Sequence, residues 1–174
     1  MIIESLKVGI LDTNCYVLGL DDKVLVIDPG DDFDKILQVI GNRNVAGIII
    51  THYHFDHIGA LDDLREKTRA KVFDRYNLKE GINKIWPFEF ECIYTPGHKE
   101  DLITIYFEEY NAMFCGDFIF EGTIGRCDLD GGDFRVMKKS IAKILNYPDD
   151  VIIYPGHGNF TSLKNERKNL STWI

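Results

Sequence analysis

Short apolar runs rich in β-branched residues alternate with turn sequences over the first third of the chain. Runs of this kind predict strands at Ile2–Val8, Cys15–Leu20 and Lys23–Ile27. Apolar residues then recur at helical spacing, which predicts a helix from Phe33 to about Asn42. A continuous apolar run predicts a buried strand over Val45–Thr51.

The rest of the chain continues this mixture of strands and helices. An amphipathic helix is predicted over Ile58–Thr68, because Leu61 and Leu64 share one face. The later pattern predicts a helix at Phe134–Leu145, a short closing helix, and strands at Ala70–Phe73, Phe88–Tyr94, Leu102–Phe107, Ala112–Cys115 and Val151–Tyr154. So many strands do not fit a doubly wound parallel sheet. We therefore predict an α+β fold in which two packed sheets carry helices on their outer faces.

Length and composition are those of an ordinary globular protein. The chain has 174 residues, of which 45% are hydrophobic and 28% charged. No repeat or linker interrupts it, so we expect a single domain over residues 1–174. The net charge of −8 argues against a nucleic-acid partner, because nucleic-acid binders usually carry a basic surface.

The chain shows no sign of export or membrane insertion. The N-terminal sequence MIIESLKVGILDTNCYVLG has neither a basic start nor a long apolar stretch, and no later apolar run approaches membrane-spanning length. Four scattered cysteines, with no CxxC pair, are expected to be buried thiols; they are Cys15, Cys92, Cys115 and Cys127. These features predict a cytoplasmic location without a membrane partner.

The segment THYHFDH concentrates metal-binding side chains in one turn. It places three histidines and Asp56 directly after the apolar run Val45–Ile50. The chain has only five histidines, and the other two, His98 and His157, follow further strands in the sequences TPGH and PGH. Asp117 ends another strand in the sequence CGDF. Loops at one edge of a rigid sheet scaffold commonly converge on a functional site.

Taken together, these side chains provide seven nitrogen and oxygen ligands: His52, His54, Asp56, His57, His98, Asp117 and His157. Each alone has an ordinary structural explanation; Asp56, for example, could cap the helix predicted to begin near Ile58. The joint arrangement favours metal binding. A structural zinc site is closed by four ligands, so seven suit two metals that share a bridging group.

The order HxHxDH, TPGH, GD and PGH resembles the metallo-β-lactamase superfamily, and the resemblance covers nearly the whole chain. The sequence IGRCDLDGGD and the closing ERKN are similar to the hydroxyacylglutathione hydrolase (glyoxalase II) branch. The resemblance implies a four-layer αββα sandwich with a dinuclear site. On the matching positions, His52, His54 and His98 would hold one metal, Asp56, His57 and His157 the other, and Asp117 would bridge them.

The sequence also departs from that branch. After TPGH the family usually continues with a threonine and small residues, whereas this chain has KEDL from Lys99 to Leu102. Glyoxalase II proteins carry an additional helical C-terminal domain, whereas this chain ends soon after His157. For Arg126, in the loop that follows Asp117, we expect an ion pair with Asp128 or Asp133 that fixes the loop, in preference to a contact with substrate.

The function predicted from these features is that of a metal-dependent hydrolase acting on a small-molecule thioester, with a metal-bridged hydroxide as the nucleophile oriented by Asp56. Two divalent ions are expected, with zinc first and iron or manganese also compatible with imidazole and carboxylate ligands. A lactonase or β-lactamase-like hydrolase on the same site stays open. So does a persulfide dioxygenase, whose single iron would use His52, His98 and Asp117.

Overall fold

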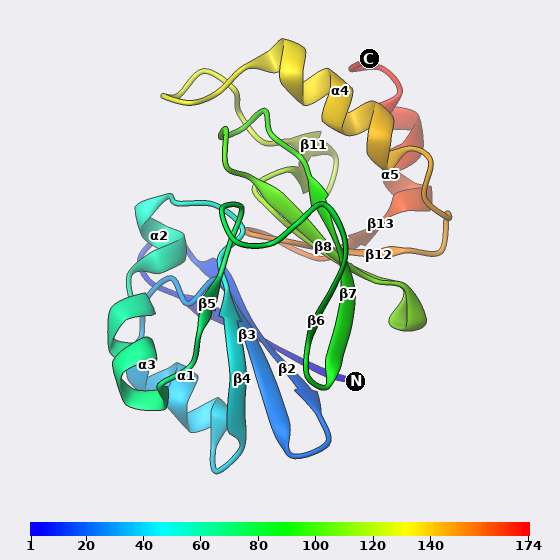
Figure 1. Cartoon of the computed structure of the whole chain (residues 1–174). Helices are drawn as coiled ribbons and strands as arrows, with labels where there is room; N and C mark the ends of the chain where they lie inside the picture. The colour runs from blue at the N-terminus through cyan, green and yellow to red at the C-terminus, as the bar shows by residue number, and fades with distance from the viewer.

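The computed structural model describes residues 1–174 and contains two β-sheets packed face to face (Figure 1). The first sheet has the order β1-β2-β3-β4-β5, with β1 at Ile2–Val8, β2 at Thr13–Leu20, β3 at Lys23–Ile27, β4 at Asn44–Ile49 and β5 at Val72–Phe73. The second has the order β13-β12-β9-β8-β7-β6, with β6 at Gly81–Ile85, β7 at Phe88–Tyr94, β8 at Ile103–Phe107, β9 at Ala112–Gly116, β12 at Ile152–Pro155 and β13 at Thr161–Ser162.

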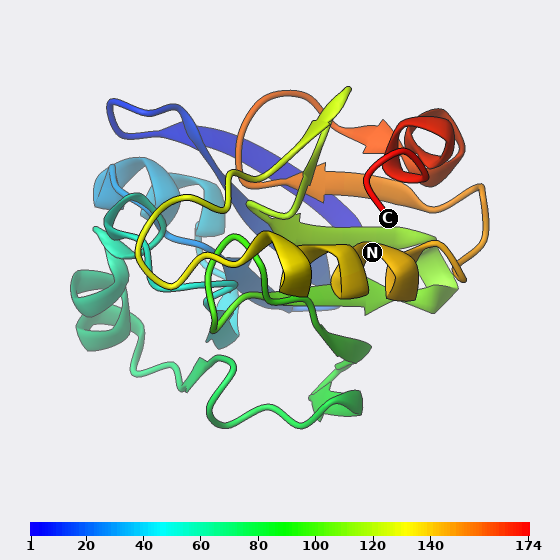
Figure 2. The same ribbon diagram turned by 90° about the horizontal axis from the view of Figure 1, so that it is seen from above.

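Helices cover the outer face of each sheet. Helices α1 (Phe33–Ile40), α2 (Phe55–Ile58) and α3 (Leu61–Thr68) lie on the side of the first sheet, and α4 (Phe134–Ile144) and α5 (Leu163–Leu170) on the side of the second (Figure 2). The order of layers is helix, sheet, sheet, helix. The predicted four-layer α+β sandwich is therefore confirmed.

Three hydrophobic clusters hold these layers together. The central cluster joins the inner faces of the two sheets, where Tyr16 and Leu25 meet Phe90 and Phe114. A second cluster packs α4 and α5 onto the outer face of the second sheet. A third packs α1 and α3 onto the first sheet. Every residue of β8 and β9 is buried, as expected for strands covered on both faces.

One predicted helix is wrong in its bounds. In place of a single helix over Ile58–Thr68, the chain forms α2 and α3, separated at Gly59 and Ala60. The turn that follows β3 causes the break, because the Ala60 amide donates to the carbonyl of Pro29 at 3.0 Å. A Cβ at Gly59 would lie 2.2 Å from the Gly30 carbonyl oxygen, so only glycine allows this approach.

The sequence pattern did not predict several elements that are short or polar. Strand β6 pairs antiparallel with β7 across a two-residue turn, but it alternates exposed and partly buried residues and carries few apolar ones. The hairpin of β10 (Ile119–Phe120) and β11 (Thr123–Ile124), the edge strand β13 and a 3-10 turn at Glu108–Tyr110 are each only two or three residues long. Elements this short leave no periodicity to detect.

Strand direction places several loops at one edge of the sandwich. Strand β4 runs parallel to β3, and β12 runs parallel to β9. Strands β7 and β9 are both antiparallel to β8, so they point the same way. The carboxyl ends of β7, β9 and β12 therefore share one edge of the second sheet. No helix of the structure is both long enough and apolar enough to cross a membrane.

Candidate metal centre

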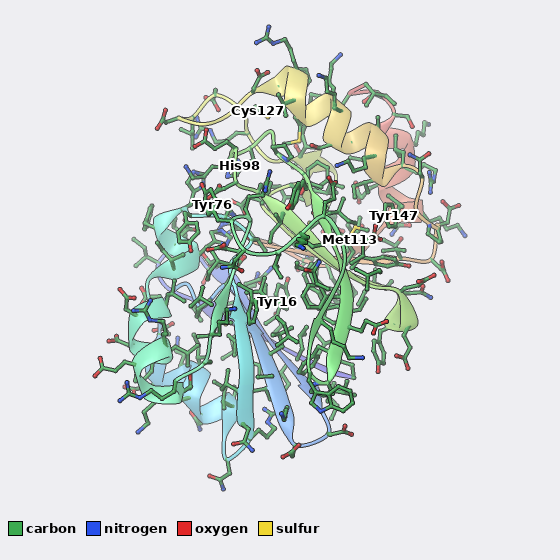
Figure 3. The ribbon with its side chains drawn as sticks, in the orientation of Figure 1. Tyr16, Tyr76, His98, Met113, Cys127 and Tyr147 are labelled. Atoms are coloured by element: carbon green, nitrogen blue, oxygen red, sulfur yellow. The ribbon has the colours of Figure 1, made fainter.

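Seven histidine and aspartate side chains meet at this edge in two groups. The first group contains His52, His54, His98 and Asp117, and the second contains Asp56, His57 and His157. Within each group the potential ligand atoms all lie within 4.8 Å of one another. Figure 3 shows His98 at the edge, with Tyr16 deeper between the sheets. All seven residues singled out from the sequence are thus brought together.

The first group is built around His54. Its Nδ1 lies 3.0 Å from His52 Nε2 and 3.0 Å from His98 Nε2. Nitrogen ligands of a tetrahedral zinc ion are separated by about 3.3 Å, because Zn–N bonds are about 2.0–2.1 Å long. The three nitrogens therefore converge at nearly the spacing that a shared metal ion imposes.

The second group is similarly compact. His157 Nε2 lies 3.1 Å from Asp56 Oδ2, and His57 Nε2 lies 3.5 Å from the same oxygen. Asp117 connects the two groups. Its Oδ2 is 3.6 Å from His98 Nε2 and 3.5 Å from His157 Nε2, and its Oδ1 is 3.4 Å from His57 Nε2. One carboxylate thus faces nitrogens of both groups.

Three of the histidines donate a hydrogen bond through Nδ1, on the side of the ring away from the centre, and so turn their Nε2 atoms toward it. His57 Nδ1 donates to Asp28 Oδ2 at 2.9 Å, His98 Nδ1 to the Arg126 carbonyl at 2.7 Å, and His157 Nδ1 to the Leu11 carbonyl at 3.1 Å. A ring that donates through Nδ1 presents an unprotonated Nε2 when it is neutral. Outer acceptors of this kind typically fix histidine ligands of metals.

Asp28 and Thr51 link the two groups from behind. Asp28 accepts hydrogen bonds from the Thr51 amide at 2.7 Å and the Thr51 hydroxyl at 2.6 Å, in addition to the one from His57. Because that hydroxyl gives its hydrogen to Asp28, its oxygen can accept from His52 Nδ1, 3.1 Å away. A single buried carboxylate thereby orients one histidine of each group.

These supporting residues were not identified from the sequence. Asp28 follows the predicted strand Lys23–Ile27 directly, so its place at a strand end was the available signal. Thr13 also supports the site, because its hydroxyl donates to Asp56 Oδ2 at 2.9 Å. Nothing in the sequence marks it, since β1 and β2 must pair before Thr13 reaches this edge.

The helix-cap alternative for Asp56 is wrong. Helix α2 begins at Phe55 and its N-cap residue is His54, so Asp56 lies within the first turn. Its carboxylate points to Thr13 and His157. The ion pair expected for Arg126 is confirmed, since its guanidinium forms two hydrogen bonds of 2.7 Å with Asp128. The cysteines are free thiols; three are buried and Cys127 is half-buried.

The electrostatics of the site favour a cation. Burial by itself lowers the pKa of His57, but the charges and hydrogen bonds of Asp28 and Asp117 outweigh it and raise that pKa to about 10. Burial tends to raise the pKa of Asp56, yet the hydrogen bond with His157 and the charge of His57 hold it below its ordinary value. The pKa values of Asp56 and Asp117 both lie below the ordinary value, so these two carboxylates are ionised and stabilise positive charge between them.

In the first group, the pKa values of two histidines are lowered. Burial, together with the neighbouring imidazoles, lowers the pKa of His52 well below its ordinary value. Burial lowers the pKa of His54 as well. Both rings are neutral at pH 7, which is the protonation state that binds metals.

Two buried atoms at the centre show that the residues fit a metal ion. His57 Nε2 and Asp117 Oδ1 are shielded from solvent and have no hydrogen-bond partner. An unsatisfied buried polar atom is costly unless something compensates it, and a bound cation would do so. Gly156 keeps the space between them open, because a Cβ there would lie 2.2 Å from Asp117 Oδ1 and 2.7 Å from His57 Cε1.

Comparison with protein families identifies the fold. The family model of the metallo-beta-lactamase superfamily matches residues 8–91 and 87–157. The chain belongs to the metallo-β-lactamase superfamily. It is 33% identical to "Probable metallo-hydrolase YqgX" of Bacillus subtilis over 94% of this chain and 93% of that protein. It is 30% identical to "Hydroxyacylglutathione hydrolase GloC" of Haemophilus influenzae over 97% of this chain and 96% of that protein.

Two solved structures superpose on nearly all of the chain. The BLEG-1 B3 metallo-β-lactamase aligns with a TM-score of 0.93 and 29% identity, over 99% of this chain and 100% of that one. A di-iron-bound form of TTHA1623 aligns with a TM-score of 0.87 and 28% identity, over 95% of this chain and 97% of that one. These relatives support a metal-dependent enzyme of the hydrolase type.

Proposed function

We propose that the protein is a thioester hydrolase of the hydroxyacylglutathione hydrolase type that holds two divalent metal ions. The observation that carries the proposal is the position of Asp117, whose two oxygens face His57, His98 and His157 from the two groups. The similarity to the Haemophilus hydroxyacylglutathione hydrolase, which extends over nearly the full length of both chains, supports the substrate class.

The two groups divide the proposed ligands. His52, His54 and His98 would hold one ion, Asp56, His57 and His157 the other, and Asp117 would be shared. Two ions at such a site lower the pKa of a bound water and polarise a substrate carbonyl. Zinc is our first expectation, and iron is supported by the di-iron form of TTHA1623, because imidazole and carboxylate ligands suit either metal.

Asp56 is the residue we propose to orient the attacking water. Its Oδ2 is fixed by the Thr13 hydroxyl at 2.9 Å and lies beside His157, and its low pKa keeps it an acceptor at neutral pH. The chain's five imidazoles are all engaged at the centre, so none is free to protonate a leaving group. A thiol with a pKa near ~8.5 departs as thiolate without that help, which suits a thioester substrate.

A second candidate is hydrolysis of a β-lactam. The specific observation in its favour is the superposition on the BLEG-1 B3 metallo-β-lactamase over essentially the whole chain. A β-lactam nitrogen is a poorer leaving group than a thiolate, so this reaction places a greater demand on proton transfer. The arrangement of imidazoles therefore favours the thioester.

A paired activity assay tests the proposal. Metal-loaded protein is given S-lactoylglutathione, with release of the thiol followed by a thiol reagent, and in parallel a chromogenic cephalosporin. We expect thioester turnover that is lost on chelation, restored by added metal, and faster in kcat/KM than lactam turnover. Turnover of the cephalosporin alone would reject the thioesterase in favour of the second candidate. Turnover unaffected by chelation would reject the metal-dependent mechanism.

A further inference from the structure

Lys99 is a half-buried cation next to the candidate metal centre that has no partner within the protein. It follows His98 directly in the chain. Three other cations on loops near this edge are engaged: Arg126 binds Asp128, Arg135 binds Asp133, and Lys7 donates to the Gly158 carbonyl. The ammonium group of Lys99 forms no hydrogen bond and no ion pair, although a lysine can donate three hydrogen bonds.

The surrounding loops hold Lys99 in place. Its carbonyl accepts from the amides of Gly97 at 3.3 Å and Leu102 at 3.4 Å, which closes the turn around His98. The next loop is tied to the same turn by the Asp133 amide, which donates to the Gly97 carbonyl at 2.8 Å. The side chain of Lys99 lies along Gly131 of that loop, its Nζ 3.7 Å from the place where a Cβ would be.

The charge of Lys99 reaches the first group of the metal centre. Burial is the main cause of the low pKa of His52, and the positive charge of Lys99 lowers that pKa further. Burial and the charge of His98 lower the pKa of His54, and Lys99 again adds to the effect. A cation this close to a candidate metal centre raises the positive potential at its mouth, where an anion is attracted.

We propose that Lys99 binds a carboxylate of the substrate whose carbonyl is held at the metal centre. The inference rests on the proposed function in that the ligand is a thioester or its products. The half-buried side chain of Lys99 ends in an ammonium group that no carboxylate of this chain, whose net charge is −8, neutralises, so this group is free to pair with an anion.

The carboxylate can belong to the acyl half or to the thiol half of a thioester. Binding of ligands that resemble the two hydrolysis products distinguishes these possibilities, and it does not require turnover. Titration calorimetry on metal-loaded protein compares glutarate with butyrate for the acyl half, and glutathione with N-acetylcysteamine for the thiol half. One carboxylate or thiolate of each ligand can reach the metals, and only glutarate and glutathione offer a further carboxylate. We expect about tenfold tighter binding of the dicarboxylate or of glutathione, in line with a charge-assisted hydrogen bond.

Lys99→Met keeps the aliphatic stem and removes the charge. It should abolish the tenfold preference within one of the two pairs and leave binding of butyrate and N-acetylcysteamine within about twofold. Lys164→Met, at an exposed position on α5, is the matched control and should leave both preferences intact. Loss of preference in the glutarate pair assigns the contact to the acyl half, and loss in the glutathione pair to the thiol half.

Two results would overturn the proposal for Lys99. One is the absence of any preference for the extra carboxylate in the unmutated protein. The other is a loss of binding affinity in Lys99→Met that is equal for all four ligands, since an equal loss would show that Lys99 supports the structure of the site and does not bind the carboxylate. Failure of thioester turnover with the preference intact would instead reject the proposed reaction and leave the carboxylate contact standing.

Discussion

His57 and Asp28 are joined by a hydrogen bond of 2.9 Å between Nδ1 and Oδ2, and both side chains are almost fully buried. Asp28 also binds the amide and the hydroxyl of Thr51, so its carboxylate accepts three hydrogen bonds in all. Thr51 in turn contacts His52. One residue outside the ligand set thus orients a histidine in each of the two groups.

Asp28→Asn should weaken metal binding about 10–100-fold, with the larger loss at the second group. An amide keeps the size of the carboxylate, but its NH₂ would face donors from Thr51 or His57. Competition with a chromophoric chelator measures the affinity of each site. Glu166→Gln is the control, because Glu166 is also buried and accepts hydrogen bonds, yet binds only Thr161 and the Gly122 amide. Equal effects of the two substitutions would contradict the role given to Asp28.

Asp56→Asn should lower kcat by about 10²-fold or more while the protein stays folded. The substitution removes the charge beside His157 and weakens the binding of the attacking water. Loss of one preorganised hydrogen-bonding group in an active site typically lowers kcat by about 10²–10³-fold. Steady-state kinetics at saturating metal, with circular dichroism as the check on folding, provide the measurement. A kcat equal to that of the unmutated protein would mean that Asp56 is not involved in the reaction.

Gly156→Ala should impair metal binding at both groups. The added methyl would lie 2.2 Å from Asp117 Oδ1 and 2.7 Å from His57 Cε1, so the shared carboxylate has to move. Gly158→Ala is the matched control on the same loop. Its φ of +75° makes alanine strained there, but no atom lies within 4 Å of the new Cβ. The control should lose about 1–2 kcal/mol of stability and keep its metals.

The sequence was sufficient to predict the two sheets and all seven proposed ligands, because strand ends such as those before His98 and Asp117 are marked by apolar runs. It did not identify Asp28, Thr51 or Thr13. These residues act through contacts between segments distant in the chain; the bond from Thr13 to Asp56 spans 43 positions. Local patterns also missed the break at Gly59, which arises from the approach of the Pro29–Gly30 turn.

Asp101 should prove to position the two histidines on either side of Tyr53. Its Oδ2 accepts from the Tyr53 amide at 3.1 Å, and the Ile103 amide donates to the Thr51 carbonyl at 2.9 Å. The first residue of β8 and the turn before it therefore hold this segment at two points. Asp101→Ala should weaken metal binding at the first group about tenfold. Asp101→Asn retains an acceptor oxygen and should restore most of the affinity. Equal losses in the two variants would show that the hydrogen bond is not what matters.

The most direct test of the dinuclear centre is the metal content of the protein, measured by elemental analysis together with thioester turnover. Two equivalents per chain are expected in fully loaded protein, and activity should rise as the second equivalent binds. Asp117→Ala removes the shared carboxylate and should retain one equivalent or fewer, with turnover lost. A single tightly bound iron, no second ion under excess metal, and oxygen uptake with glutathione persulfide in place of thioester hydrolysis would contradict the account.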